Sequence, residues 1–338
     1  MTSDRPFDVR DVPRFASIDA DKLQREYFDR GMPCVLSGFH RRDELEAWRE
    51  RLSSSQEEVL CVVARTRNIS KISDADRPPV SQAGEFPEHN EFVAELSLAE
   101  VWGRVREPDA YEPILARGET IYLIEAELPK SLAFPRRRND GDAEPEGAEH
   151  ADEDPMRALV WNDPRMPQTI LSMPGTINRN HTHVHEVLLH QIHGRKSVRL
   201  FSPADTAYLY MNDERRSQVL DFDQPDVDRY PLVRRASAWE TVLEPGDVLF
   251  LPSYWWHEIR VAEPSISLGY PVQAGFWAQS MFRLHHEMAD QLERCAADPV
   301  FDGSTARGAM AIVATATGAG LAEASLDEVV AGLRYDYE

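Results

Sequence analysis

The stretch Gly175–Gly194 reads GTINRNHTHVHEVLLHQIHG and holds five of the chain's eleven histidines. In an extended strand alternate side chains share a face, so His181, His183 and His185 would converge on one side. Glu186 would then point to the opposite side. The three imidazoles would span about 13 Å of backbone. Histidine nitrogens gathered in this way are typical of a metal site, so the stretch predicts a metal centre around which the fold is built.

A second stretch, Gly246–His257, completes the predicted centre. It reads GDVLFLPSYWWH, in which a Gly-Asp turn leads into an apolar strand that ends at Pro252. His257 follows on the return of the chain and would bring a third imidazole from a distant strand. Trp255 and Trp256, just before it, are expected to pack in the core.

The second half of the chain is predicted to be mainly β. Short apolar runs separated by Gly and Pro follow one another from residue 168 to residue 272, without helices between them. This pattern is typical of an antiparallel sandwich or barrel. His190 and His193 are expected on the outer part of the sheet. Arg199 alternates with Val198 and Leu200, and is expected at the surface or in a salt bridge.

The first half predicts flanking α/β elements. Helices are expected over residues 19–31, 41–52 and 92–105, and strands over 32–39, 57–66 and 118–129. After residue 275 the pattern becomes helical again, and residues 279–295 carry an apolar stripe. Packing on the domain and packing on a dimer partner explain that stripe equally well.

Composition sets limits on the function. A chain of 338 residues with a net charge of −21 has a field that repels phosphate backbones, so nucleic-acid binding is not expected. Only three cysteines are present and none forms a CxxC pair, so histidine and carboxylate must hold any metal. No apolar run of membrane-spanning length and no signal pattern is found, and a cytoplasmic protein is expected. Residues 136–155 hold eight acidic residues and predict a mobile acidic loop.

The two histidine motifs also carry a resemblance. Their pattern, GxxxxxHxH and a later GxxxxxPxxxxH, together with LLHQIHGRKSVRLFSPADTAYLY, resembles the JmjC-like oxygenases of the cupin-8 group. The resemblance implies a double-stranded β-helix, the cupin or jelly-roll core, over residues 1–275. Residues 276–338 would then form a separate helical segment that is a candidate dimerisation surface.

The resemblance implies a set of cofactors and ligands. Fe(II) would be bound by His181, His183 and His257, with His185 as a candidate additional ligand. No other catalytic residue is expected. O₂ and 2-oxoglutarate would be the cosubstrates.

The resemblance also implies how 2-oxoglutarate would be held. Lys196 would pair with its distal carboxylate, and Tyr122 would hydrogen-bond the same group. Asn178 stands where the family often has Thr or Ser near that carboxylate. The sequence around Lys196 also indicates an anionic partner independently of the resemblance, because a lysine inside an apolar strand needs one.

Three positions depart from the family pattern. The second metal ligand is usually a carboxylate, in HxD or HxE, but here it is His183. Two asparagines of the family fall on Val187 and near Gly269. A three-histidine face leaves as many open metal positions as two histidines and a carboxylate, but it neutralises none of the metal charge.

Three functions therefore remain open. The first is a 2-oxoglutarate-dependent iron hydroxylase acting on a small molecule or a peptide. The second is a three-histidine cupin dioxygenase or oxidase that does not use 2-oxoglutarate. The third is a metal-binding cupin without turnover, serving as a sensor or interaction domain, and a different metal such as zinc would suit it.

Overall fold

The structure is a computed structural model, and it describes residues 6–64, 84–86, 91–107, 120–127, 168–183, 186–210 and 216–272. The acidic stretch 136–155, His185, the 275/276 boundary and the C-terminal segment lie outside these residues, so the predictions about them stay predictions. Within the described part, no helix is long and apolar enough to span a membrane.

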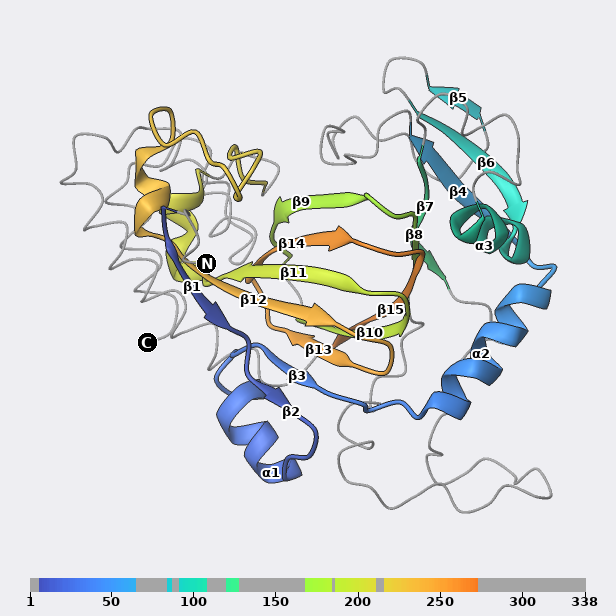
Figure 1. Ribbon diagram of the computed structural model, residues 1–338, viewed down its shortest axis with the longest axis horizontal. Helices are drawn as coiled ribbons and strands as arrows, with labels where there is room; N and C mark the ends of the chain where they lie inside the picture. The colour runs from blue at the N-terminus through green and yellow to red at the C-terminus, as the bar shows by residue number, and fades with distance from the viewer. Residues whose placement is uncertain are drawn as a thin grey trace, which may run out of the picture.

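Two β-sheets form the body of the molecule (Figure 1). The five-stranded sheet has the order β1-β12-β11-β14-β9, and its strands are β1 Asp8–Asp11, β12 Ser237–Leu243, β11 Lys196–Phe201, β14 Trp256–Val261 and β9 Ile177–His181. The other sheet has ten strands in the order β2-β3-β13-β10-β15-β8-β7-β4-β6-β5. Its strands are β2 Arg14–Phe15, β3 Cys34–Leu36, β13 Val248–Leu251, β10 Glu186–His193, β15 Ser265–Val272, β8 Gln168–Ser172, β7 Thr120–Glu127, β4 Glu58–Ala64, β6 Glu91–Ser97 and β5 Gly84–Phe86.

The sheets pack face to face through an apolar layer. Leu200 and Leu243 of the five-stranded sheet share one buried cluster with Leu189 and Leu249 of the other. Neighbouring strands at the centre of both sheets run antiparallel. The prediction of a mainly β jelly-roll core with flanking helices is therefore confirmed.

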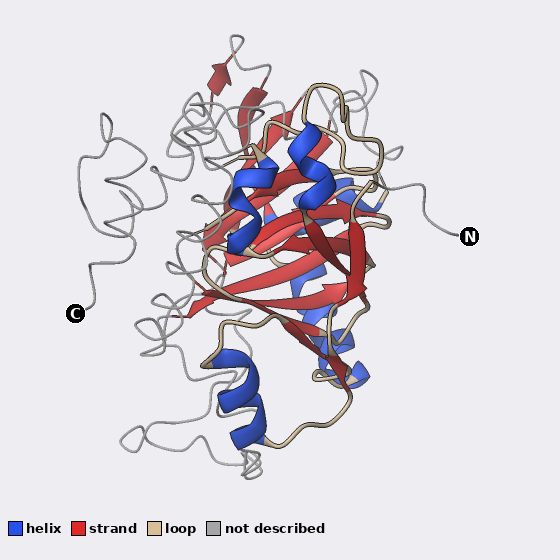
Figure 2. Cartoon of the chain, turned by 90° about the vertical axis from the view of Figure 1, so that its left-hand side faces the viewer, coloured by secondary structure: helices blue, strands red, loops and turns tan. Residues whose placement is uncertain are grey.

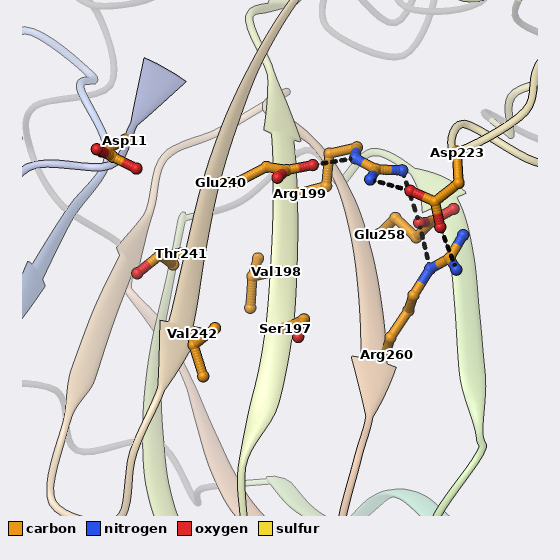
Figure 3. Close-up of a pocket in the computed structure, with 10 residues that line it drawn as sticks. All are labelled: Asp11, Ser197, Val198, Arg199, Asp223, Glu240, Thr241, Val242, Glu258 and Arg260. Carbon is orange, nitrogen blue, oxygen red and sulfur yellow. Dashed lines mark hydrogen bonds and ion pairs between the residues drawn. The ribbon is translucent and has the colours of Figure 1, made fainter. Parts of the chain in front are cut away.

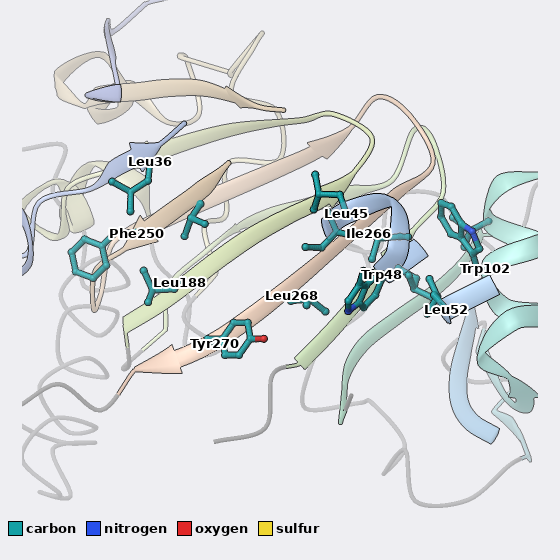
Figure 4. Close-up of a cluster of buried hydrophobic side chains, with 14 of the residues drawn as sticks. Leu36, Leu45, Trp48, Leu52, Trp102, Leu188, Phe250, Ile266, Leu268 and Tyr270 are labelled. Atoms are coloured by element: carbon teal, nitrogen blue, oxygen red, sulfur yellow. The ribbon is translucent and has the colours of Figure 1, made fainter. Parts of the chain in front are cut away.

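A second apolar cluster covers the opposite face of the ten-stranded sheet (Figure 4). Helices α2 (Arg42–Ser54) and α3 (Leu98–Arg106) contribute Trp48 and Trp102 to it, and both side chains are buried. Helix α1 (Ala20–Leu23) continues as a π-helical turn, Gln24–Phe28, and Asp19 caps its start. In the side view the helices lie around the strands (Figure 2). Two 3₁₀ segments, Pro203–Leu209 and Pro231–Arg235, connect β11 to β12.

One predicted helix is wrong in its first half. Residues 91–97 form β6, which pairs with β4 along its whole length, and the helix begins only at Leu98. Ser97 marks the boundary, because its side chain accepts a hydrogen bond from the N–H of Glu100 at 3.2 Å and so caps the helix. Pairing with a distant strand outweighs the local helical pattern.

The turn that opens the second histidine motif needs glycine. Gly246 has φ +102°, and a Cβ there would lie 3.0 Å from the carbonyl oxygen of His40. Asp247 secures the same turn, because its carboxylate accepts hydrogen bonds from Glu244 N at 2.9 Å and from Arg14 Nη1 at 2.7 Å. The start of β13 is thereby fixed, and β13 leads to His257.

Candidate metal centre

The structure brings together three of the predicted histidines. His181 ends β9 and His257 lies in β14, where the two residues are register partners. His183 follows two residues after His181, and one nitrogen from each of the three rings lies within 4.8 Å of the others. His181 and His257 are buried, and His183 is half-buried.

The rings are oriented so that their Nε2 atoms converge. His181 Nδ1 lies 2.7 Å from the carbonyl oxygen of Arg179, and His257 Nδ1 lies 3.0 Å from that of Trp255. A carbonyl only accepts, so both Nδ1 atoms carry the proton and both Nε2 atoms keep a lone pair. This arrangement, with a carbonyl fixing the ring, is the usual support of a metal-binding histidine.

The spacing of these nitrogens suits a metal. His181 Nε2 and His183 Nε2 are 3.0 Å apart. Two metal–nitrogen bonds of about 2.1 Å at a right angle place their nitrogens about 3.0 Å apart. A direct hydrogen bond between the two rings would have the same length, so the distance fits a metal without requiring one.

The alternation predicted that the histidines come from one continuous strand, and this prediction is wrong. Strand β9 ends at His181 and belongs to the five-stranded sheet, whereas β10 begins at Glu186 in the other sheet. The chain therefore crosses between the sheets after His181. The N–H of Tyr254 holds the crossing in place by donating to the carbonyl of His183 at 2.8 Å. Tyr254 adopts φ 60° at this point, an uncommon conformation for a residue other than glycine.

The surroundings keep the imidazoles of His181 and His257 neutral. Burial, followed by repulsion from His257, His183 and Arg216, lowers the pKa of His181 well below its ordinary value. Burial also lowers the pKa of His257 to about 4. Metal binding needs the unprotonated ring, so the cluster is prepared for a cation near neutral pH.

Lys196 begins β11 and faces the same interior space. Leu200, four residues on, pairs with His257, and alternate residues of a strand share a face. The Lys196 side chain is 2% exposed, and burial lowers its pKa to about 7. Among the described residues no hydrogen-bond or ion-pair partner is found for it. A buried ammonium group with no carboxylate beside it suits an anionic ligand.

The other predicted site residues are less defined. Asn178 lies in β9 next to Ile259 of β14, and it is half-buried. Tyr122 lies in β7, where its backbone pairs with Ser172 and Val62, but its side chain is outside the described part. The roles of these two residues, and that of His185, stay predictions.

Comparison with known proteins assigns the chain to a protein family. The model of the cupin-like domain family matches residues 20–273. The chain belongs to the cupin-8 family. This JmjC-like family comprises oxygenases of the iron and 2-oxoglutarate type, as the resemblance had implied.

Individual relatives agree with this assignment. The chain is 26% identical to tRNA wybutosine-synthesizing protein 5 of Danio rerio over 248 residues, which cover 73% of this chain and 70% of the relative. The protein of the same name from Mus musculus is 27% identical over 250 residues, 73% of each chain. Lysine-specific demethylase 8 of Xenopus tropicalis is 34% identical over 123 residues, 36% of this chain and 26% of the relative.

Two of the departures from the cupin-8 pattern, Val187 and Gly269, lie on the face between the two sheets. Val187 packs against the cluster between the sheets, together with Leu189 and Leu251. Gly269 is the register partner of Leu189, so it shares that face. The two positions where this family has asparagine therefore carry no side-chain hydrogen-bonding group here.

The remaining residues of the histidine stretch face away from the interior. Glu186 and His190 share the face of Leu188, which packs in the second apolar cluster. His190 was expected on the outer part of the sheet, but it is fully buried, and its Nδ1 lies 2.7 Å from His40 Nε2. The N-terminal elements cover this face, which the local sequence could not show. His193 is half-buried, with Arg49 Nη1 3.0 Å from its Nδ1.

Arg199 is a salt-bridge residue, as one of its two predicted placements stated, and it is buried. It contacts Asp223 at 2.6 Å, Glu240 at 2.7 Å and Glu258 at 3.3 Å on the outer face of the five-stranded sheet (Figure 3). These charges line a surface pocket, which Arg260 also borders.

Sequence reasoning missed Arg216. It forms an isolated β-bridge with His181 and is 4% exposed. It lies within the polar run NDERRSQ, where no periodicity and no motif distinguish it from its neighbours.

Proposed function

We propose that this protein is a mononuclear non-haem iron oxygenase that uses 2-oxoglutarate and hydroxylates a small molecule or a peptide. His181, His183 and His257 would hold Fe(II), and Lys196 would hold the distal carboxylate of 2-oxoglutarate. The observation that carries this proposal is the buried ammonium group of Lys196, which faces the same interior space as the histidines and has no carboxylate partner among the described residues.

Bound Fe(II) would supply the chemistry, by activating O₂ while 2-oxoglutarate is decarboxylated and a C–H bond of the substrate is hydroxylated. The chain supplies positioning. The carbonyls of Arg179 and Trp255 orient two of the imidazoles, and Tyr254 fixes the backbone of His183. Leu251 and the other apolar residues between the sheets keep water from the cosubstrate side.

The substrate class follows from charge. A net charge of −21 disfavours a phosphate backbone, although two of the relatives are named for a tRNA modification. We therefore propose a small molecule or a peptide as substrate, and a cytoplasmic enzyme that forms homodimers through the segment 276–338, for which the sequence predicts helices.

The test uses the full chain loaded with Fe(II) in the absence of O₂. After 2-oxoglutarate and O₂ are added, succinate formation is measured. We expect slow succinate formation without added substrate, and its loss in Lys196→Met. The matched control is Arg195→Met, which removes the adjacent, exposed cation that pairs with Glu263. A wild-type protein that binds iron but neither binds nor consumes 2-oxoglutarate would refute the proposal.

One observation favours a second function, that of a three-histidine oxygenase without 2-oxoglutarate. Val187 and Gly269 give no polar contact on the interior face, and His183 replaces a carboxylate. In that case Lys196→Ala would leave O₂ consumption largely intact. If the protein instead retained Zn(II) tightly and showed no turnover with iron, a non-catalytic sensor or interaction domain would explain the cluster.

A further inference from the structure

Lys196 lies in an apolar wall of the interior. Its register partners are Leu243 of β12 and Val261 of β14, and both side chains are buried. The Lys196 side chain is 2% exposed, and no hydrogen-bond or ion-pair partner is found for it among the described residues. An ammonium group that is removed from water without a partner releases its proton more readily than an exposed one does.

The charged groups nearest along the three strands do not compensate for this burial. Arg195 precedes Lys196 and is exposed. Glu244 and Glu263, which follow the two apolar register partners, act on the guanidinium of Arg195. Burial is the cause that lowers the pKa of Lys196 to about 7. The strands on either side of Lys196 therefore leave its ammonium group uncompensated.

The groups across the interior are uncharged. Gln191 of β10 shares the face of Leu189, and Ser267 of β15 is its register partner. Both are fully buried, and Ser267 Oγ donates to Gln191 Oε1 at 2.7 Å. The metal centre lies further along the strand, because Leu200 is the residue that pairs with His257. A divalent ion bound there would oppose a positive charge on the lysine, in the same direction as burial.

We propose that Lys196 couples the binding of 2-oxoglutarate to the uptake of a proton, so that the cosubstrate binds more weakly as the pH rises above neutrality. This inference rests on the proposed function, because it requires that Lys196 meets the distal carboxylate of 2-oxoglutarate. An opposite charge in a buried site favours the ammonium form, so the arriving carboxylate restores the proton. That proton comes from the solvent and is held on Nζ between the amine and the carboxylate.

The direction of the pH effect follows from the two states of Lys196. Without the cosubstrate its pKa is about 7, and the carboxylate in the complex raises it. Below about pH 7 the lysine is charged in both states, so the affinity does not change with pH. Above that pH the free protein has lost the proton and must regain it, so the Kd rises about tenfold per pH unit until the pH reaches the pKa of the complex.

The test counts protons by calorimetry on the full chain loaded with Mn²⁺, without O₂. 2-Oxoglutarate is titrated in at one pH in two buffers that differ in ionisation enthalpy, and the difference in heat gives the number of protons taken up. We expect about 0.9 proton per site at about pH 8 and about 0.1 at about pH 6. Lys196→Arg should bind without this uptake, because a guanidinium stays charged at both pH values. Arg195→Met, which removes the adjacent exposed cation, should take up protons as wild type does.

Two outcomes would overturn the inference and leave the proposed function standing. Wild type could bind 2-oxoglutarate equally well at both pH values and take up no proton, a result that needs no variant and is unaffected by any folding defect. Proton uptake that persists in Lys196→Arg would assign the titration to another group. By contrast, a metal-loaded wild type that does not bind 2-oxoglutarate would overturn the proposed function, and the inference with it.

Discussion

Two buried cations on one strand have opposite surroundings. Arg199 and Lys196 both belong to β11, three residues apart, and are 7% and 2% exposed. Arg199 faces outward and contacts three carboxylates at 2.6–3.3 Å. Lys196 faces the interior, and no carboxylate partner is found for it among the residues that the structure describes.

The difference indicates what each cation is for. Burying a charge costs several kcal/mol unless a partner offsets it. At Arg199 the chain supplies that partner, so the network is structural. At Lys196 the described part of the chain supplies no such partner, which is expected if a bound anion offsets the cost of burying the charge. Four predictions test this contrast.

The largest effect is expected when the structural network is broken. Arg199→Met should lower the free energy of unfolding by about 3 kcal/mol, because three carboxylates lose a partner and Glu258, which is 2% exposed, would keep only Arg260 at 2.8 Å. Urea unfolding measures the change. An unfolding midpoint equal to that of wild type would show that the carboxylates do not depend on Arg199.

The same substitution at Lys196 should act in the opposite direction. Without ligand, Lys196→Met is expected to raise the free energy of unfolding by about 1–3 kcal/mol, since an apolar side chain replaces an uncompensated buried charge. Thermal and urea unfolding of the apo protein are the measurements. Destabilisation similar to that of Arg199→Met would instead reveal a structural ion pair.

The stability of the apo protein should depend on pH through Lys196. Its pKa is about 7 in the folded protein and 10.5 as the ordinary value, so the unfolded chain binds more protons between these two values. Stability therefore rises with pH from about 7 towards 10.5, by up to about 1.4 kcal/mol per pH unit. Comparing urea unfolding of wild type and Lys196→Met at several pH values isolates this contribution. Parallel pH profiles would contradict the assignment of a lowered pKa.

The smallest effect is expected at Arg195, directly before Lys196. Its guanidinium is exposed and pairs with Glu263 at 2.6 Å, and exposed ion pairs contribute little to stability. Arg195→Met should leave both the unfolding midpoint and 2-oxoglutarate binding unchanged. A marked loss of cosubstrate affinity in this variant would mean that the general positive charge near β11 matters, rather than the placement of Lys196.

The sequence predicted much of this arrangement but not the parts that depend on distant segments. The motif spacing was enough to identify His181, His183 and His257 as candidate metal ligands. The position of Lys196 within an apolar strand was enough to identify it as a candidate partner of an anion. The strand at Glu91–Ser97 was missed because its partner, β4, is not visible to a local helical pattern. His190 was misplaced because its contact with His40 spans 150 residues.

Arg216 shows a different limit. A bridge to His181 places it beside the histidines, and its own neighbours in the sequence are polar and irregular. The break between β9 and β10 was also hidden, because an unbroken alternation of histidines predicts a single strand. Arg216 pairs with the edge strand β9, and the chain passes from β9 to β10 inside the other sheet; periodicity registers neither event.

The most direct measurement is the affinity of the metal-loaded protein for 2-oxoglutarate. Calorimetric titration of 2-oxoglutarate into the Mn²⁺ form, without O₂, should show a single site in wild type and in Arg195→Met. In Lys196→Met the affinity should fall about 100-fold or more, because the ligand carboxylate loses its charged partner. Equal affinity in wild type and Lys196→Met, or no binding to a metal-loaded wild type, would contradict the account.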